Sequence, residues 1–233
     1  MLTMNKKISV LMSVYNSENT LEDSIKSILN QTFTDFEFLI SDDGSTDGSV
    51  EILKSYEKID SRINIYFNKE NIGLTKSLNK LLKHSSSEYI ARQDSDDKSF
   101  DKRLENQMNV INNLNLDFCT SRALKDGKNI TPNLKHFLPY KIVMNYLNPF
   151  VHGTLLIKEK IIKELGGYDE RFYYAQDYKL FKDLLNKNYK YKVISTPLYY
   201  LNSKNNISSN KKKEQYYYAD CVRKDKIPKT KII

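Results

Sequence analysis

The sequence is poor in several residue types, and each shortage argues against a class of protein. Its 233 residues include no tryptophan, seven glycines and only two cysteines. Cys119 and Cys221 lie far apart with no metal-ligand spacing, so neither a disulfide framework nor a zinc site is expected. No apolar run reaches the roughly 18 residues that a membrane-spanning helix requires. A globular protein of the reducing cytoplasm is therefore expected.

Glycine-rich phosphate-binding loops are missing as well. No Gly-x-Gly-x-x-Gly follows the first apolar run, and no Gly-Lys-Ser or Gly-Lys-Thr occurs in the chain. Such loops bring backbone amides close to nucleotide phosphates, and their glycines make this approach possible. Neither a dinucleotide-dependent dehydrogenase nor a P-loop nucleotidase is expected, so any nucleotide must be held by carboxylates and a metal.

Positive charge is concentrated at the end of the chain. The formal net charge is +8, and residues 211–233 hold eight Lys or Arg against three Asp or Glu. The rest of the chain is close to neutral, which argues against a nucleic-acid-binding face on it. No nucleic acid partner is expected.

Short apolar runs alternate with amphipathic helical stripes over the first hundred residues. This alternation predicts an α/β fold, with a mostly parallel, Rossmann-like sheet covered by helices on both faces. The Asp126-Gly127 pair predicts a hairpin turn, and residues 129–152 are expected to be irregular. The predicted strands are 8–14, 36–40, 63–67, 88–93, 117–121, 153–157, 191–195 and 198–201.

Polar clusters follow each of the first four predicted strands. Ligands of open α/β sheets bind beyond the carboxyl ends of the strands, so these clusters are expected to form one site. They are Tyr15-Asn16, Asp42-Asp43, residues 68–73 and residues 94–97.

The segment 92–97 (RQDSDD) is the most acidic of these clusters. In an extended segment, residues two apart project to the same side, which would bring Asp94 and Asp96 together. Two converging carboxylates suit Mg²⁺ or Mn²⁺, with water and phosphate oxygens as the remaining ligands. The sequence therefore predicts half of a metal-diphosphate site, with a solvated acidic turn as the alternative.

Five motifs in order resemble the family 2 glycosyltransferases of GT-A fold, of the bacterial polysaccharide type. The resemblance covers roughly residues 6–203. The motifs are SVYN at 13–16, SDDGSTD at 41–47, NIG at 71–73, IARQDSDD at 90–97, and GGYD at 166–169 followed by QDY at 176–178.

The resemblance implies a role for each matching position. Residues 1–97 would form the nucleotide-sugar-binding half, and residues 98–203 the acceptor-binding half of the same domain. Asp94 and Asp96 would bind Mn²⁺ or Mg²⁺, Asp177 would be the general base, and His152 would contact the acceptor or the diphosphate. The nucleotide-sugar would contact Val14, Tyr15, Asn16, Asp42, Asp43, Gly73, Lys76, Asp94 and Ser95.

The activity implied is transfer of a hexose from a nucleotide-sugar, with a UDP-sugar expected, to an acceptor hydroxyl with inversion. The acceptor would be a glycan or a lipid-linked glycan in surface polysaccharide synthesis. Ser203 stands where relatives often carry a histidine, which would weaken metal binding. A nucleotidyltransferase and a non-catalytic GT-A binding module are the alternatives, because fold alone does not separate them.

The basic tail, residues 204–233, lies outside the resemblance. Its cations surround three consecutive tyrosines, Tyr216, Tyr217 and Tyr218. Tyrosine favours the membrane-water interface, and each basic residue near an anionic leaflet contributes about 1 kcal/mol. The tail is therefore expected to hold the protein at the inner face of the plasma membrane, with a solvated tail as the alternative.

Overall fold

The computed structural model describes residues 6–133, 137–202 and 211–229. The strands are β1 (Ile8–Val14), β2 (Phe36–Asp42), β3 (Ile63–Phe67), β4 (Tyr89–Arg92), β5 (Lys98–Ser99), β6 (Phe118–Lys125), β7 (Asn129–Thr131), β8 (Leu156–Lys158) and β9 (Tyr191–Leu201). The helices are α1 (Leu21–Leu29), α2 (Ser49–Ile59), α3 (Leu74–His84), α4 (Arg103–Leu114), α5 (Tyr140–Val143), α6 (Glu159–Glu164), α7 (Gln176–Asn186) and α9 (Lys212–Arg223), with a short 3-10 helix at His152–Thr154.

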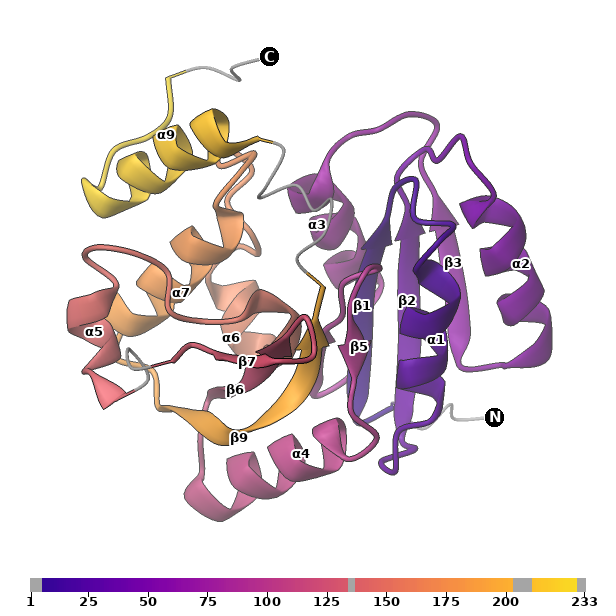
Figure 1. Cartoon of the computed structure of the whole chain (residues 1–233), viewed down its shortest axis with the longest axis horizontal. Coiled ribbons are helices and arrows are strands. Elements are labelled where there is room, and N and C mark those ends of the chain that lie inside the picture. The colour runs from indigo at the N-terminus through magenta and orange to yellow at the C-terminus, as the bar shows by residue number, and fades with distance from the viewer. Residues whose placement is uncertain (1–5, 134–136, 203–210, 230–233) are drawn as a thin grey trace.

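Within the described residues the strands form one sheet, in the order β3-β2-β1-β4-β8-β6-β9-β5, with β7 paired to β6. The pairs β2-β3, β1-β2 and β1-β4 are parallel, as predicted for the first half of the chain. In the second half β8 is antiparallel to both β4 and β6, so the sheet is mixed there. The two halves lie side by side in Figure 1 and share this continuous sheet.

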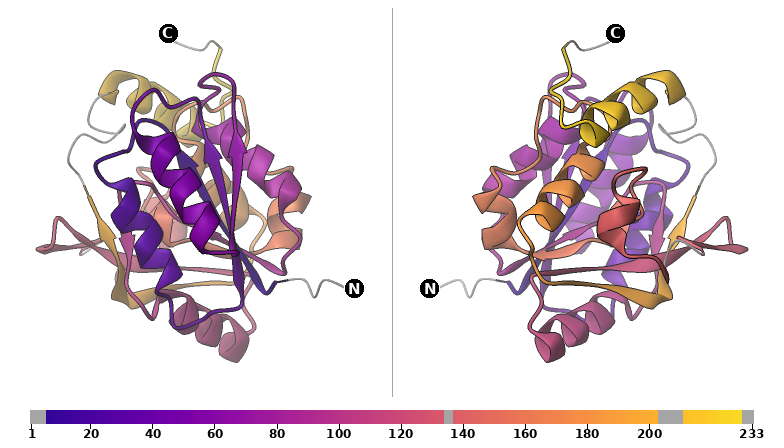
Figure 2. Two further views of the ribbon diagram at one scale, coloured as in Figure 1. Left: turned by 90° about the vertical axis from the view of Figure 1, so that its right-hand side faces the viewer. Right: turned by 90° about the vertical axis from the view of Figure 1, so that its left-hand side faces the viewer.

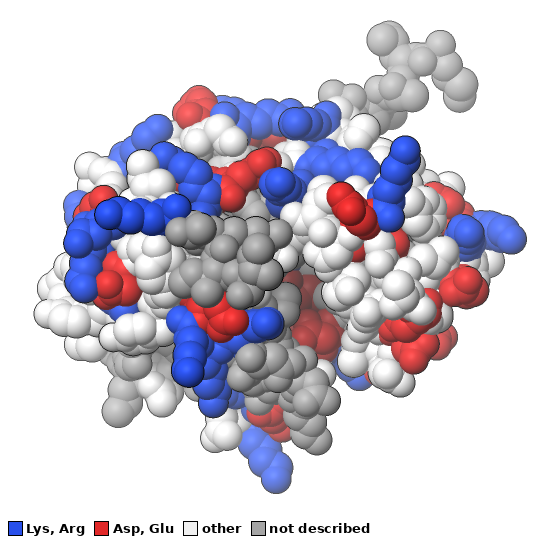
Figure 3. All heavy atoms as spheres, turned by 90° about the horizontal axis from the view of Figure 1, so that it is seen from above, with Lys and Arg blue, Asp and Glu red and all other residues white. Residues whose placement is uncertain are grey.

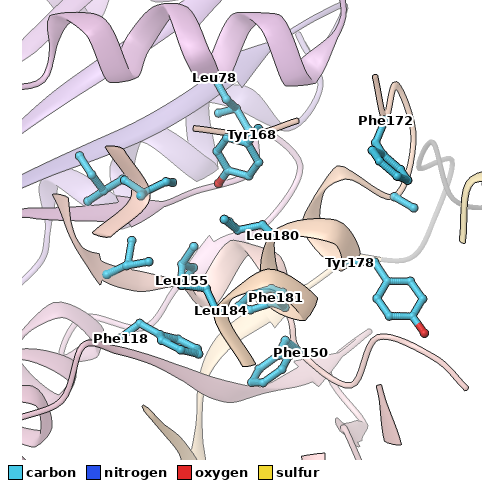
Figure 4. Close-up of a cluster of buried hydrophobic side chains, with 14 of the residues drawn as sticks. Leu78, Phe118, Phe150, Leu155, Tyr168, Phe172, Tyr178, Leu180, Phe181 and Leu184 are labelled. Atoms are coloured by element: carbon cyan, nitrogen blue, oxygen red, sulfur yellow. The ribbon is translucent and has the colours of Figure 1, made fainter. Parts of the chain in front are cut away.

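Two hydrophobic cores lie on opposite faces of the sheet. In β1 the side chains of Ile8, Val10 and Met12 contact one core and that of Leu11 the other, as the alternation of a strand requires. The first core is covered by α1, α2 and α4, and the second by α3, α6, α7 and α9. Figure 4 shows the second core, where Phe181 of α7 stacks on Phe150 with ring centroids 4.3 Å apart. Each buried side chain of this size contributes about 1.5–3 kcal/mol.

Several local predictions need correction in the second half. The two strands predicted around Pro197 are one strand, because Pro197 lies at a shift of register against β6, where a missing N–H is tolerated. The strand predicted at 153–157 begins only at Leu156, after the 3-10 helix. The irregular segment 129–152 contains β7 and α5. The Asp126-Gly127 hairpin is confirmed, with positive φ angles of 50° and 73°.

The end of the chain forms α9, which belongs to the second core. Tyr218, Cys221 and Val222 are buried against α7, and Lys182 of α7 donates hydrogen bonds to the carbonyl oxygens of Val222 (2.6 Å) and Arg223 (3.2 Å). These carbonyls end α9 and lack partners within the helix, so Lys182 caps it. Residues 204–210 and 230–233 of the basic tail lie outside the described residues. No helix in the described ranges is long and apolar enough to cross a membrane.

Candidate active site

The carboxyl ends of β1, β2 and β4 meet at one edge of the sheet. Val14 pairs with Asp42 and Leu11 with Arg92, and the backbone N–H of Asp43 donates to the carbonyl of Val14 at 2.8 Å. The predicted convergence of the strand-end clusters is therefore present. The side chain of Val14 points into the core and is buried, so only its backbone faces the site.

The two neighbouring aspartates of β2 have different surroundings. Asp43 accepts hydrogen bonds from the backbone N–H groups of Ile72 and Gly73 and from the Asn68 amide, all at 2.9 Å, and so holds the loop after β3 in place. Asp42 accepts one bond, from the N–H of Ser45, through Oδ2. Its Oδ1 is buried with no hydrogen-bond partner in the described part of the chain. Asp42 thus has an acceptor available for a ligand, whereas Asp43 has a structural role.

The loop after β1 is fixed to the loop after β2. Asn16 has a φ of 49°, its N–H donates to the Ser45 hydroxyl, and its Oδ1 accepts from the N–H of Thr46 at 2.8 Å. Asparagine tolerates this left-handed conformation better than most residues. Tyr15 is left half exposed beside this contact. Tyr15 and Asn16 therefore form a rigid edge of the site, at which the ring of Tyr15 is accessible.

Residues 94–97, the acidic turn, close on themselves instead of continuing β4. The N–H of Asp97 donates to the carbonyl of Asp94, and Ser95 and Asp96 lie in the turn. The expectation that Asp94 and Asp96 lie in an extended segment and project to the same side is therefore wrong, because the segment is a turn. The turn is braced by Gln93, whose amide donates to the carbonyls of Asp94 and Asp97, and by Ser95, whose hydroxyl bonds to that of Ser17 at 2.8 Å.

The carboxylates of the acidic turn are close enough to repel each other. Burial, together with the charge of Asp94, raises the pKa of Asp96 to about 6 and that of Asp97 to about 9. Asp94 itself is ion-paired with the buried guanidinium of Arg92. Arg92 also donates to the Leu11 carbonyl at 2.6 Å, which ties the turn to β1. Seen from the strand ends in Figure 3, acidic side chains lie in the hollowed centre of this face.

A second buried arginine, Arg103, supports the first. It donates to the carbonyl of Arg92 at 2.7 Å and to the hydroxyl of Ser99 at 2.8 Å, and burial lowers its pKa to about 10. The guanidinium lies 5.3 Å from the ring centroid of Tyr199, whose hydroxyl accepts from the N–H of Asp94. No role was predicted for Arg92, Arg103 or Tyr199. The one available signal was for Arg92, a charged residue directly after an apolar run.

Gly73 and Lys76 begin α3 at the rim of the site. Gly73 has a φ of 91°, and a Cβ atom there would lie 2.6 Å from the ring of Tyr173, which comes from the second half of the chain. Only glycine allows both this conformation and this contact. Lys76 is exposed on the first turn of the helix.

Asp177 approaches the acidic turn from the other half of the molecule. It lies in the first turn of α7, where it accepts a hydrogen bond from the Asn148 amide at 2.8 Å. Burial raises its pKa, and the charge of Asp94 raises it further, while the N–H of Tyr178 and Asn148 act in the opposite direction. The charge of Asp94 therefore acts on Asp177 although the two residues come from different halves of the chain.

His152 is buried beside Tyr168 and is neutral at pH 7. Burial and the nearby charge of Arg92 lower its pKa to about 3, and its Nε2 is 2.8 Å from the hydroxyl of Tyr168. Burial raises the pKa of Tyr168, so the hydroxyl keeps its proton. His152 therefore carries no positive charge for a diphosphate, and its predicted contact with the acceptor or the diphosphate stays a prediction.

The donor atoms present fit a hard divalent cation held with few protein ligands. The carboxylates of Asp94 and Asp96 are close enough to repel each other, and a cation bound to their oxygens would relieve this repulsion. Across the described ranges, no group of three or more His, Cys, Asp or Glu is arranged to hold a metal. Water and donor phosphate would complete the coordination. Ser203, the predicted replacement of a histidine ligand, lies outside the described residues.

A known protein family resembles this chain over most of its length. The model of Glycosyl transferase family 2 matches residues 9–194. The O-antigen biosynthesis glycosyltransferase WbnJ of Escherichia coli is 34% identical over 186 residues, which cover 77% of this chain and 72% of WbnJ. EpsE of Bacillus subtilis (strain 168) is 38% identical over 172 residues, 70% of this chain. The chain spans 60% of the length of EpsE.

Two solved structures share the fold at low sequence identity. S. aureus TarS 1-349 in complex with UDP has a TM-score of 0.75 at 21% identity, with 93% of this chain and 64% of that chain covered. The mannosyltransferase PcManGT from Pyrobaculum calidifontis, in complex with GDP-Man and Mn²⁺, has a TM-score of 0.72 at 18% identity, with 97% and 67% covered. The chain belongs to glycosyl transferase family 2 and has the GT-A fold.

Proposed function

We propose that the protein transfers a hexose from a nucleoside diphosphate donor to an acceptor hydroxyl, with inversion at the anomeric carbon. The observation that supports this best is that Asp177, in the first turn of α7, is near enough to the acidic turn that, besides burial, the charge of Asp94 raises its pKa. A single displacement needs a base on one side of the sugar and a stabilised leaving group on the other. Asp177 would be the base on one side, and the carboxylates of the acidic turn would act on the leaving-group side.

The donor nucleotide would lie at the ends of β1 and β2. The free Oδ1 of Asp42 can accept a hydrogen bond from a nucleobase N–H, and the exposed ring of Tyr15 offers a stacking surface. The solved structures hold UDP or UDP-GlcNAc in TarS and GDP-Man in PcManGT. We favour a UDP-sugar here, since uracil presents one ring N–H to a carboxylate. The exposed Lys76 would lie near the diphosphate.

Asp94 and Asp96 would hold Mn²⁺ or Mg²⁺. Such a cation supplies a Lewis acid that stabilises the charge developing on the diphosphate. The ion pair with Arg92 fixes the carboxylate of Asp94, and Gln93 holds the backbone of the turn. These bonds keep the ligands in place before the donor arrives, which lowers the entropic cost of binding.

Asp177 would take the proton from the acceptor hydroxyl. Its raised pKa brings it closer to the value that suits a general base at neutral pH. The hydrogen bond from Asn148 to Oδ2 orients the carboxylate. By analogy with WbnJ, whose name gives O-antigen biosynthesis, the acceptor would be a glycan or lipid-linked glycan in surface polysaccharide synthesis.

Product release with a panel of nucleotide-sugars tests the proposal. The protein with Mn²⁺ or Mg²⁺ should release UDP from a UDP-sugar when an acceptor glycan is supplied. Asp177→Asn should keep donor affinity and lose transfer by at least about 10²-fold. Asp183→Asn, at the other end of α7, is the matched control and should retain activity. Transfer by Asp177→Asn within about tenfold of the wild type would exclude Asp177 as the base.

The two alternatives are addressed by the same assay. A nucleotidyltransferase would need a glycine-rich basic loop after β1, and residues 15–20 contain neither glycine nor a basic residue. A non-catalytic module would bind donor with metal and release no nucleoside diphosphate with any donor in the panel.

A further inference from the structure

The cations of the predicted tail are carried by a folded helix with a fixed orientation. α9 is anchored on its inner side by Tyr218 and Val222 and at its end by Lys182, which is also ion-paired with Asp225 at 2.8 Å. The ammonium group of Lys182 is desolvated there and is compensated by two carbonyls and a carboxylate. The outer side of α9 is therefore held in one position relative to the domain.

That outer side combines positive charge with an exposed aromatic ring. Lys212, Tyr216 and Arg223 are spaced by four and seven residues, which places them on one side of a helix. Tyr216 is 69% exposed, and the guanidinium of Arg223 lies 5.1 Å from its ring centroid. This side faces away from the buried Tyr218.

A second segment, residues 137–146, exposes apolar side chains. Leu138, Ile142 and Tyr146 follow one another at intervals of four residues, and Ile142 and Tyr146 are 57% and 71% exposed. The opposite side of α5 is buried through Val143. Phe137 adds a further exposed ring beside Leu138. This short helix is apolar on both sides, and none of the described residues buries its solvent-facing side.

The two segments adjoin each other. Arg223 at the end of α9 donates a hydrogen bond to the backbone carbonyl of Tyr146 at 3.4 Å. In the right-hand view of Figure 2, which looks at this side of the molecule, α9 lies above α7 and α5. We call the exposed side chains Phe137, Leu138, Ile142, Tyr146 and Tyr216 the α5–α9 face.

Unpaired cations accompany this face. Lys212, Lys213, Lys226 and Lys229 are exposed and make no ion pair with any residue that the structure describes. The segment after α9 is held along the helix, since the N–H of Lys229 donates to the hydroxyl of Tyr217 at 3.0 Å. Exposed tyrosine and aliphatic side chains among free lysines are complementary to a surface that is anionic outside and apolar beneath.

We propose that the α5–α9 face docks on an anionic lipid bilayer. The lysines would contact lipid phosphates while Ile142, Tyr146 and Tyr216 enter the interfacial region, where an aromatic ring and its hydroxyl are both satisfied. α9 connects this face to the site, because Tyr218 on the inner side of α9 meets the ring of Tyr174, in the loop that precedes Asp177, edge-on at 5.7 Å. Docking would thus bring the acceptor side of the site to the bilayer. The docking itself does not depend on the proposed function.

Cosedimentation with vesicles tests the electrostatic part. The full chain should pellet with phosphatidylglycerol vesicles at low salt and be released at high salt. The fourfold variant K212E/K213E/K226E/K229E should lose roughly 10²-fold or more in partition coefficient, since each cation near an anionic surface contributes about fivefold. Lys58→Glu with Lys69→Glu, on the far half, is the control and should have little effect. Equal pelleting of the fourfold variant would overturn the proposal.

A second variant tests the apolar part without changing charge. Ile142→Ser with Tyr146→Ser should weaken binding by about tenfold or more, whereas Ile59→Ser with Leu114→Ser, at exposed positions elsewhere, should not. Circular dichroism establishes that each variant is folded. Equal binding to neutral phosphatidylcholine vesicles would refute anionic recognition. Self-association without lipid that is lost in the same variants, measured by sedimentation velocity, would assign the face to a second copy of the chain instead.

Discussion

Replacing Asp97 by asparagine should stabilise the protein, although Asp97 lies in the acidic turn. Burial and the charges of Asp94 and Asp96 raise the pKa of Asp97 to about 9, so its carboxyl is protonated in the folded protein at pH 7. The unfolded chain has an ordinary carboxyl pKa near 3.9 and carries no proton there. Because the folded state binds one more proton, the free energy of unfolding falls as the pH rises from about 4 towards 9.

The magnitude follows from this proton difference. With a difference of one bound proton, the free energy of unfolding changes by about 1.4 kcal/mol per pH unit. Because of Asp97, the free energy of unfolding should be up to about 4 kcal/mol lower at pH 7 than at pH 4. In the wild type, Oδ1 of Asp97 accepts a hydrogen bond from the N–H of Asn202 at 2.7 Å. An asparagine side chain keeps an oxygen for this bond and is uncharged at every pH. Asp97→Asn should therefore raise the free energy of unfolding by about 2–4 kcal/mol at pH 7, allowing for relaxation of the turn.

Urea unfolding without metal, at several pH values between 5 and 8.5, measures this difference. The gap between Asp97→Asn and wild type should be small at pH 5 and widen as the pH rises. Asp60→Asn is the control of opposite sign, since the hydrogen bond from Arg62 lowers the pKa of Asp60 and its loss should destabilise by less than about 1 kcal/mol. A destabilised Asp97→Asn variant, or a gap that does not change with pH, would refute the electrostatic account of the turn.

Two further substitutions test the two sides of the donor site. Asp96→Ala should abolish Mn²⁺-dependent binding of a nucleoside diphosphate in calorimetry while the fold is retained; unchanged metal-dependent affinity would remove Asp96 from the metal site. Gly73→Ala should destabilise the protein by at least about 1–2 kcal/mol in thermal unfolding, because its φ of 91° is strained for alanine and its Cβ would lie 2.6 Å from the ring of Tyr173. Wild-type stability of Gly73→Ala would mean that Tyr173 moves freely.

The first half of the fold was predictable from sequence because its signals are local. Buried parallel strands are short apolar runs, and β1 begins and ends where its apolar run does, at Ile8 and Val14. The second half was harder to predict, because β9 continues through Pro197 only by virtue of its shifted pairing with β6, which lies some seventy residues earlier. The pairing with β6 makes β9 one continuous strand, and a local sequence pattern does not show a pairing between distant residues.

The site was predicted at the level of residue types and only partly at the level of roles. Asp42 and Asp43 are neighbours of the same residue type, so the sequence does not tell their roles apart. In the structure Asp43 accepts hydrogen bonds from Ile72 and Gly73, whereas Asp42 keeps a free oxygen. The ion pair of Arg92 with Asp94 was missed because a buried arginine has no periodic signal. The predicted roles of Asp96, Asp177 and the other site residues await the experiments above.

The continuous sheet limits how this molecule can move. β4, at the end of the first half, is hydrogen-bonded to β8 of the second, and the N–H of Arg92 donates to the carbonyl of Leu155 at 2.9 Å. A hinge between the two halves would break these bonds, and it would also separate Asp97 from Asn202. Closure around a donor is therefore left to surface loops, such as the one that carries Tyr173, and not to a rigid-body rotation. Cross-linking the two halves should consequently leave turnover unchanged, whereas restraining that loop should not.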